Sequence, residues 1–154
     1  MKKCDHTSVG MLVWQNDNLL LIERRNPPFG FAPPAGHVDQ DSSFEKAALR
    51  ELEEEVGLEV KSLKMIIEGR KENKCRREDG NWHHFKIYEC ITDGCIKRSL
   101  RETKAVGWYS RERLAELSKR TEKYQSGEIN EDDWEKSPGI EPVRYEWFKD
   151  LNVI

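Results

Sequence analysis

The sequence predicts one α/β domain in which strands and helices pack in layers, and two observations indicate this class. Short segments with alternating apolar and polar residues are spaced along the first two thirds of the chain, as in a sheet. One long amphipathic segment interrupts these strands, and a second helical segment follows them. Strands interrupted by one helix and closed by another favour an α/β layer structure. The length of 154 residues fits a single domain, 1–154, with one substantial core.

The predicted strands follow from apolar content and from the turns between them. Polar residues 15–18 form a turn between the first two strands, and the prolines at 27–28 end the second. Asp-Gly pairs at 79–80 and 93–94 mark turns before and after the predicted strand 82–91. The predicted strand ranges are 8–14, 19–24, 60–69, 82–91, 95–100 and 105–109.

The long helix is predicted from its caps and its apolar periodicity. Asp41, Ser42 or Ser43 can cap its start, and Gly57 stands where a left-handed C-terminal cap would lie. On a repeat of about 3.6 residues, a narrow apolar stripe forms along one side. The members of this stripe are Leu49, Leu52 and Val56.

Three carboxylates crowd another side of the same helix. Glu51, Glu54 and Glu55 stand at i, i+3 and i+4. Like charges four residues apart cost about 0.2–0.5 kcal/mol in an isolated helix, and neighbouring Arg50 alone cannot neutralise three anions. Oxygen ligands on a rigid element suit Mg²⁺ or Mn²⁺. A solvated acidic helix face is the alternative interpretation.

The residues around these glutamates resemble the Nudix box, whose form is G-x5-E-x7-R-E-U-x-E-E-x-G-U with U an aliphatic residue. Residues 50–58 match its C-terminal half, and Gly36 lies at the right distance upstream, so the box covers 36–58. Ser42 occupies the position where the box has its first glutamate. Residues 29–36 resemble the family's loop into the box, and Glu102 with the segment 106–110 resembles a later part of the family. The chain is therefore identified as similar to MutT-like Nudix hydrolases over about residues 7–118.

This resemblance implies a Nudix-type α/β/α sandwich with a mixed β-sheet between helices. It implies metal-dependent hydrolysis of a diphosphate bond in a nucleoside diphosphate linked to another moiety, including nucleoside triphosphates. The metal, Mg²⁺ or Mn²⁺, is expected on Glu51, Glu54, Glu55 and the carbonyl of Gly36. The general base is expected among Glu51, Glu54 and Glu102, while Arg50 is expected to orient the glutamates by ion pairing. The alternative is a Nudix-like module that binds nucleotide or RNA without turnover.

Basic and aromatic residues outside the acidic helix are candidates for substrate binding. Arg76 belongs to the basic segment 70–77, which abuts Trp82, and together they could hold phosphates and stack a base. Phe31, just before the box, is a second candidate for stacking. The alternatives are a solvated hairpin with Trp82 half-buried and a role for Phe31 in core packing.

The C-terminal part of the chain is predicted to begin with a helix capped by Ser110, with Leu114 and Leu117 facing inward. Beyond it, residues 121–154 contain an acidic run, a Ser-Pro-Gly break at 137–139 and a dense group of aromatic residues. Aromatic residues at this density usually pack against something. Docking of 121–154 on the domain is favoured over contact with a second copy, and a homodimer is the alternative.

Composition narrows the classes of partner. A net charge of −3, with many residues of both signs, argues against bulk binding of nucleic acid or of an anionic membrane. There is no apolar stretch of about eighteen residues, and residues 1–6 lack the apolar region of a signal peptide, so a cytoplasmic protein is expected. The cysteines at 4, 75, 90 and 95 contain no C-x-x-C pair, so free thiols are expected rather than disulfides or a zinc site.

Overall fold

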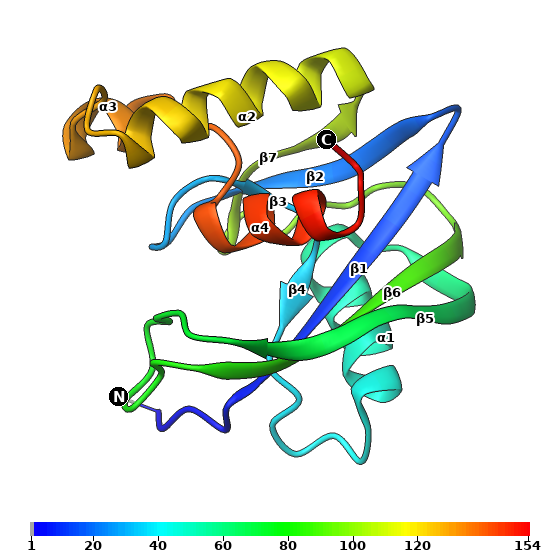
Figure 1. The fold of residues 1–154 in the computed structure, drawn as a ribbon. Coiled ribbons are helices and arrows are strands. Elements are labelled where there is room, and N and C mark those ends of the chain that lie inside the picture. The colour runs from blue at the N-terminus through cyan, green and yellow to red at the C-terminus, as the bar shows by residue number, and fades with distance from the viewer. Residues whose placement is uncertain (1) are drawn as a thin grey trace.

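The structure, a computed structural model, describes residues 2–154 and consists of a β-sheet between two layers of helices (Figure 1). Helix α1 covers one face of the sheet, and helices α2 and α4 cover the other. The strands are β1 (Thr7–Gln15), β2 (Asn18–Arg24), β3 (Phe31–Ala32), β4 (Ala35–Gly36), β5 (Glu59–Lys71), β6 (His83–Asp93) and β7 (Thr103–Tyr109). The helices are α1 (Phe44–Val56), α2 (Arg111–Gln125), α3 (Glu131–Lys136) and α4 (Pro142–Asp150). Among residues 2–154, no helix is both long enough and apolar enough to cross a membrane.

The sheet is mixed. Its main path runs β3-β2-β1-β6-β5, with β4 also pairing with β1 and β7 with β2. Strands β1 and β6 are parallel, whereas the other strand pairs described are antiparallel. A mixed sheet covered by helices on both faces confirms the predicted α/β/α sandwich.

Alternation along the central strands divides the apolar side chains between two cores. In β1, Val9 and Met11 pack with α1, while Leu12 packs on the opposite face with α2 and α4. In β2, Leu20 belongs to the first core and Leu21 to the second. Because these strands are buried on both faces, they read as nearly continuous apolar runs rather than as strict alternation.

Local sequence decides where α1 begins and ends. The Ser43 hydroxyl accepts a hydrogen bond from the Lys46 amide at 3.1 Å, and Gly57 adopts the left-handed conformation with φ 75°. Both caps were predicted. The inward face was predicted less well, because Leu49 is 42% exposed and the small residues Ala47 and Ala48 lie against the sheet instead. Small residues there let the helix approach the strands closely.

The prediction of a strand at 95–100 is wrong, because this segment bonds to the end of α1 rather than to the sheet. The Lys97 amide donates to the Val56 carbonyl at 2.7 Å, and the Ser99 amide donates to the Glu55 carbonyl at 2.9 Å. The last carbonyls of a helix have no partner within the helix, so this loop supplies their donors. The loop thereby brings residue 102 beside the C-terminal half of α1.

The C-terminal residues pack across the sheet face opposite α1. Trp147 and Phe148 of α4 are buried in the second core, with 2% and 0% of their surfaces exposed. Gly10 of β1 makes room for this helix, since a Cβ atom there would lie 2.6 Å from Cζ3 of Trp147. A short bridge between Phe31 and Ile140 also joins the segment before α4 to β3.

Candidate active site

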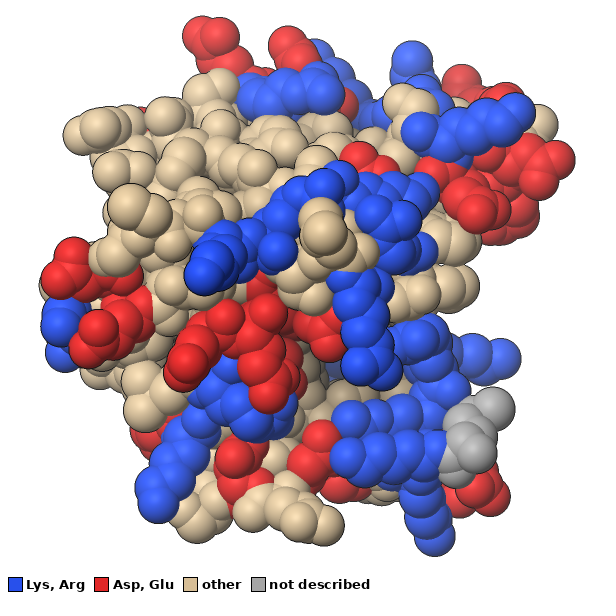
Figure 2. All heavy atoms as spheres, turned by 180° about the vertical axis from the view of Figure 1, so that it is seen from behind, with Lys and Arg blue, Asp and Glu red and all other residues tan. Residues whose placement is uncertain are grey.

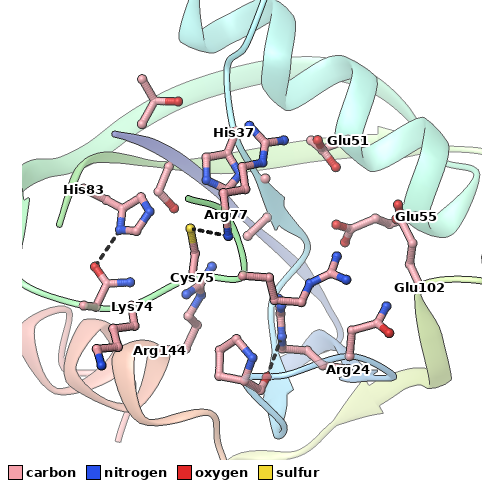
Figure 3. A pocket seen from close by; sticks show the side chains of 18 of the residues that line it. Arg24, His37, Glu51, Glu55, Lys74, Cys75, Arg77, His83, Glu102 and Arg144 are labelled. Atoms are coloured by element: carbon pink, nitrogen blue, oxygen red, sulfur yellow. Dashed lines mark hydrogen bonds between the residues drawn. The ribbon is translucent and has the colours of Figure 1, made fainter. Parts of the chain in front are cut away.

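The functional-site candidates gather where α1, β4 and the loop before β7 meet. Glu51 and Glu55 lie four residues apart on the buried side of α1, and Glu102 approaches them from the loop. One carboxylate oxygen from each of these three residues lies within 4.8 Å of the others. Figure 3 shows the three side chains together at one end of a pocket. The structure thus unites two residues of the box with one from about fifty positions downstream.

Glycine at position 36 is required by the close approach of Glu51. A Cβ atom at Gly36 would collide with the carboxylate of Glu51. Strand β4 holds Gly36 in place by pairing it with Val9 of β1. The main chain at Gly36 therefore lies directly against the acidic cluster, where its carbonyl was predicted to contribute.

Without a cation, burial and mutual repulsion destabilise the ionised forms of Glu51 and Glu55. Burial raises the pKa of Glu51 to about 7, and nearby Glu102 and Glu54 add to this rise against the opposing effect of Arg50. Burial and repulsion from Glu51 and Glu102 raise the pKa of Glu55 well above its ordinary value. Oε2 of Glu55 is buried without a hydrogen-bond partner among the described residues. An unpaired buried oxygen within an all-carboxylate cluster fits a hard divalent cation such as Mg²⁺ or Mn²⁺.

Arg50 joins α1 to the loop before it. Its guanidinium donates to Asp41 at 2.8 Å, to Glu51 at 2.8 Å and to the carbonyl of His37 at 2.9 Å. It also donates to Glu54 at 3.1 Å. These contacts fix the orientation of the Glu51 carboxylate and hold the loop that follows β4. The part of Arg50 in catalysis stays a prediction.

Glu54 lies apart from the carboxylate cluster. On a helix, Glu51 and Glu55 are separated by about 40° around the axis, while Glu54 is about 60° from Glu51 in the opposite sense. The Glu54 side chain is accordingly 52% exposed and paired with Arg50. Its role as a metal ligand and as a base candidate stays a prediction, and Glu102 takes the third place in the cluster.

The acidic cluster opens into a cavity of about 510 Å³ whose lining also carries several Lys and Arg side chains. Figure 2 shows acidic side chains bordered by Lys and Arg on one face of the molecule. The basic residues that line the cavity are Lys2, Arg24, Lys74, Arg76, Arg77, Arg101 and Arg144. Only Arg76 among them was predicted as a substrate-binding residue. Lys74 and Arg77 belong to the same basic segment, 70–77. Lys2, Arg24, Arg101 and Arg144 lie on separate segments and form no motif, so no sequence signal marked these four.

The two predicted aromatic contacts lie elsewhere. Phe31 is 9% exposed and belongs to the second core, with its ring centroid 5.4 Å from that of Tyr109, so it is occupied by packing. Trp82 stacks on His6 at 4.2 Å between ring centroids, and the guanidinium of Arg70 lies 4.1 Å from its ring. Neither side chain lines the cavity. Their predicted stacking with a substrate base therefore has no support in the structure.

Comparisons with known proteins place this architecture in a family. The NUDIX domain family model matches residues 5–130. Over 60 residues, the chain is 42% identical to an ADP-ribose pyrophosphatase from Methanocaldococcus jannaschii. That match covers 36% of this chain and 36% of the relative, so it spans about a third of the relative's length.

Solved structures share the fold at low sequence identity. A MutT NUDIX hydrolase from Burkholderia pseudomallei is 22% identical and superposes with a TM-score of 0.61, over 70% of this chain and 84% of that one. A NUDIX hydrolase from Nitrosomonas europaea is 16% identical with a TM-score of 0.63, over 96% of this chain and 88% of that one. Because the family model covers most of the residues and the acidic helix lies within the matched range, the chain belongs to the Nudix family.

Proposed function

We propose that this protein hydrolyses a diphosphate bond in a nucleoside diphosphate linked to another moiety, with Mg²⁺ or Mn²⁺ as the cofactor. One observation carries the proposal: the carboxylates of Glu51, Glu55 and Glu102 meet at one end of a cavity whose remaining walls carry arginine and lysine. A diphosphate group needs both a cation site and positively charged partners for its outer oxygens. This cavity offers the two side by side.

The basic side chains suit the binding of phosphate oxygens. Arginine presents several N–H donors in one plane and can hold two oxygens of a phosphate at once. Arg24 comes from β2, Arg76 from the loop between β5 and β6, and Arg144 from α4, so the cations approach from several directions. Nε of Arg144 is buried with no hydrogen-bond partner among the described residues. A phosphate oxygen would supply that partner.

Glu51, Glu55 and the Gly36 carbonyl would hold the cation beside Glu102, and the bound cation would screen the charge of the diphosphate and favour attack by water on phosphorus. The chain's own groups have distinct tasks around it. Arg50 fixes Glu51, while burial of Glu51 and Glu55 keeps competing water away from their carboxylates. Glu102 is exposed, so it can accept a proton from water and return it to solvent. We therefore favour Glu102 as the general base.

The volume of the cavity and the activity of the matched relative both support this class of substrate. A volume of about 510 Å³ lies within the usual range for small-molecule pockets, about 300–1,000 Å³. The matched relative is an ADP-ribose pyrophosphatase. ADP-ribose, an adenosine diphosphate linked to ribose, is accordingly the first compound to test, followed by nucleotide sugars, dinucleoside polyphosphates and nucleoside triphosphates.

The test is a substrate panel with Mg²⁺ in which products are identified by mass spectrometry. With ADP-ribose, we expect AMP and ribose 5-phosphate, and reaction in ¹⁸O-labelled water shows which phosphorus the water attacks. Glu51→Gln should abolish turnover, whereas Glu53→Gln, an exposed neighbour on the same helix, should not. Tight binding of nucleotides with no turnover anywhere in the panel would instead support the binding-module alternative.

A further inference from the structure

A second cluster of potential metal ligands lies on the opposite wall of the cavity from the glutamates. Cys4 precedes β1, His37 follows β4, Cys75 lies between β5 and β6, and His83 begins β6. One ligand atom from each of these four residues lies within 4.8 Å of the others. Figure 3 shows His37, Cys75 and His83 on the side of the pocket away from Glu55 and Glu102. Two thiols and two imidazoles thus meet from four separate segments.

Two of the separations between these ligand atoms match the edges of a zinc tetrahedron. Sγ of Cys4 lies 3.6 Å from Nε2 of His37 and 3.4 Å from Nε2 of His83. With Zn–S distances of about 2.3 Å and Zn–N distances of about 2.0–2.1 Å, tetrahedral angles place sulfur and nitrogen about 3.5 Å apart. Hydrogen bonds alone account for these two contacts, since a thiol can donate to one ring nitrogen and accept from the N–H of another. A cation at the centre would serve all four side chains, including Cys75.

The hydrogen bond between His83 and Asn73 leaves the other ring nitrogen of His83 able to bind a metal. Its Nδ1 lies 3.0 Å from Oδ1 of Asn73, and an amide oxygen only accepts, so Nδ1 carries the proton. The lone pair of Nε2 is then directed at the cluster. Histidines that bind metals usually donate their other ring N–H to an oxygen in this way.

Both sulfur atoms receive backbone hydrogen bonds in the same pattern. The amide of His6 donates to Sγ of Cys4 at 3.2 Å, and the amide of Arg77 donates to Sγ of Cys75 at 3.4 Å. In each case the donor lies two residues after the cysteine. Such donors stabilise negative charge on sulfur, and the thiolate is the form of cysteine that binds metals.

The turn that carries Cys75 is closed tightly around its sulfur. The amide of Cys75 donates to the carbonyl of Gly80 at 2.7 Å, and the amide of Gly80 donates to the carbonyl of Arg77 at 3.1 Å. A Cβ atom at Gly80 would collide with Sγ of Cys75. The backbone of 75–80 therefore presents this sulfur to the cluster, and Cys4 and His83 are buried beside it with 4% and 3% of their surfaces exposed.

From this geometry we infer that Cys4, His37, Cys75 and His83 form a structural Zn²⁺ site. The sulfur and imidazole donors suit zinc, whereas the all-oxygen cluster suits magnesium. Four protein ligands leave no position for substrate, so the site is structural rather than catalytic. It differs from the expectation of free thiols, which rested on the absence of a C-x-x-C spacing.

The consequence of this site concerns the shape of the cavity. Zinc would join the N-terminal segment, the loop after Gly36 and the loop between β5 and β6, which carries Lys74, Arg76 and Arg77. These cations would then be held at a fixed distance from the carboxylates. Without zinc, hydrogen bonds and ion pairs hold this wall, among them the pairs of Asp39 with Arg77 and Lys2 and of Asp79 with Lys3.

The first experiment measures metal directly on the full chain, purified under reducing conditions without a histidine tag. Elemental analysis should find one zinc per chain after dialysis against Mg²⁺. Replacement by Co²⁺ should give the visible absorption of tetrahedral cobalt with thiolate ligands. Absence of zinc combined with no uptake of Zn²⁺ or Co²⁺ would overturn the inference, as would a Cys4–Cys75 disulfide in the protein as it is purified from the cell.

Variants assign the ligands. Cys75→Ser should lose the cobalt absorption and lower the affinity for zinc by at least about 100-fold, and Asn73→Ala should lower it by about 10–100-fold while keeping the tetrahedral spectrum. Cys95→Ser is the matched control, because Cys95 is exposed and outside the cluster. Unchanged zinc binding by Cys75→Ser would exclude Cys75 as a ligand and overturn the site.

A measurement on the unmodified chain covers the case in which Cys75→Ser does not fold. A strong chelator should lower the thermal unfolding midpoint, and Zn²⁺ should restore it while Mg²⁺ does not. Equal restoration by Mg²⁺ would place the stabilising ion on the carboxylates and contradict the inference. None of these readouts uses hydrolysis, so the zinc site and the proposed activity succeed or fail separately.

Discussion

Replacing Glu51 with glutamine should make the Mg²⁺-free protein more stable while it removes activity. The substitution keeps the shape of the side chain and its acceptor for Arg50, but it removes a buried negative charge. Burial raises the pKa of Glu51 from its ordinary value of 4.5 to about 7. At about 1.36 kcal/mol per pKa unit, holding this carboxylate ionised without Mg²⁺ costs about 3 kcal/mol of the free energy of unfolding.

The sign of the pH dependence follows from proton linkage. The folded protein binds the Glu51 proton more tightly than the unfolded chain does, so this contribution to stability is complete below about pH 4.5 and is lost as the pH rises through about 7. The stability advantage of Glu51→Gln should therefore be about 3 kcal/mol near pH 8 and below about 1 kcal/mol near pH 5. For a chain of this length, about 3 kcal/mol corresponds to about 6–12 °C in the unfolding midpoint.

The assay is urea unfolding followed by circular dichroism in Mg²⁺-free buffer at both pH values, with one equivalent of Zn²⁺ present throughout. Saturating Mg²⁺ should then stabilise the unmodified protein by about 2.7 kcal/mol at a hundred times its dissociation constant, and Glu51→Gln should gain much less. Glu53→Gln, exposed on the same helix, should change stability by less than about 0.5 kcal/mol at either pH. A loss of stability in Glu51→Gln near pH 8, or an effect independent of pH, would refute the reasoning.

Three further predictions test other parts of the site and fold. Glu102→Gln should lower kcat by about 10²–10⁴-fold with a smaller effect on KM, because a general base acts in the transition state. A change in KM alone, measured by steady-state kinetics, would contradict this role. The ion pair with Arg77 lowers the pKa of Asp39 to about 2. Asp39→Asn should therefore lower the free energy of unfolding by about 2 kcal/mol at neutral pH, and this loss should disappear between about pH 4 and 2. A loss that stays constant in acid unfolding curves would argue against this role of the ion pair. Phe148→Ala should cost about 3–5 kcal/mol in urea unfolding, because Phe148 is fully buried, and a cost under about 1 kcal/mol would mean that α4 is not part of the core.

Features that depend on neighbours in the sequence were the ones that could be predicted. The caps of α1 follow from Ser43 and Gly57, because a hydroxyl and a left-handed glycine act within one turn of the helix. The shared face of Glu51 and Glu55 follows from the helical repeat alone. The central strands were found because their buried runs are long and apolar. Most of the fold and the acidic half of the site were therefore open to prediction.

Features that depend on contacts between distant segments were missed or misplaced. Residues 95–100 carry a strand-like pattern, yet they bond to the free carbonyls at the end of α1 and so bring Glu102 to the cluster. Phe31 and Trp82 have the chemistry of stacking residues, but partners elsewhere in the fold occupy both rings. The secondary-structure propensity and side-chain chemistry of these residues could not predict their contacts, since each contact depends on which distant segment of the fold lies next to the residue.

The sequence by itself determined the Nudix resemblance and the pair of glutamates on one side of α1, because both are local patterns along one element. The sequence also offered Glu102 and Arg76 as candidates, but only the tertiary structure placed Glu102, rather than Glu54, beside Glu51 and Glu55. It also decided the rest of the basic lining of the cavity and the cluster of Cys4, His37, Cys75 and His83. Those groups come from segments that share no spacing rule. The sheet and its loops bring them within a few ångströms, and burial there makes the charges need partners that an unfolded chain in water would not require.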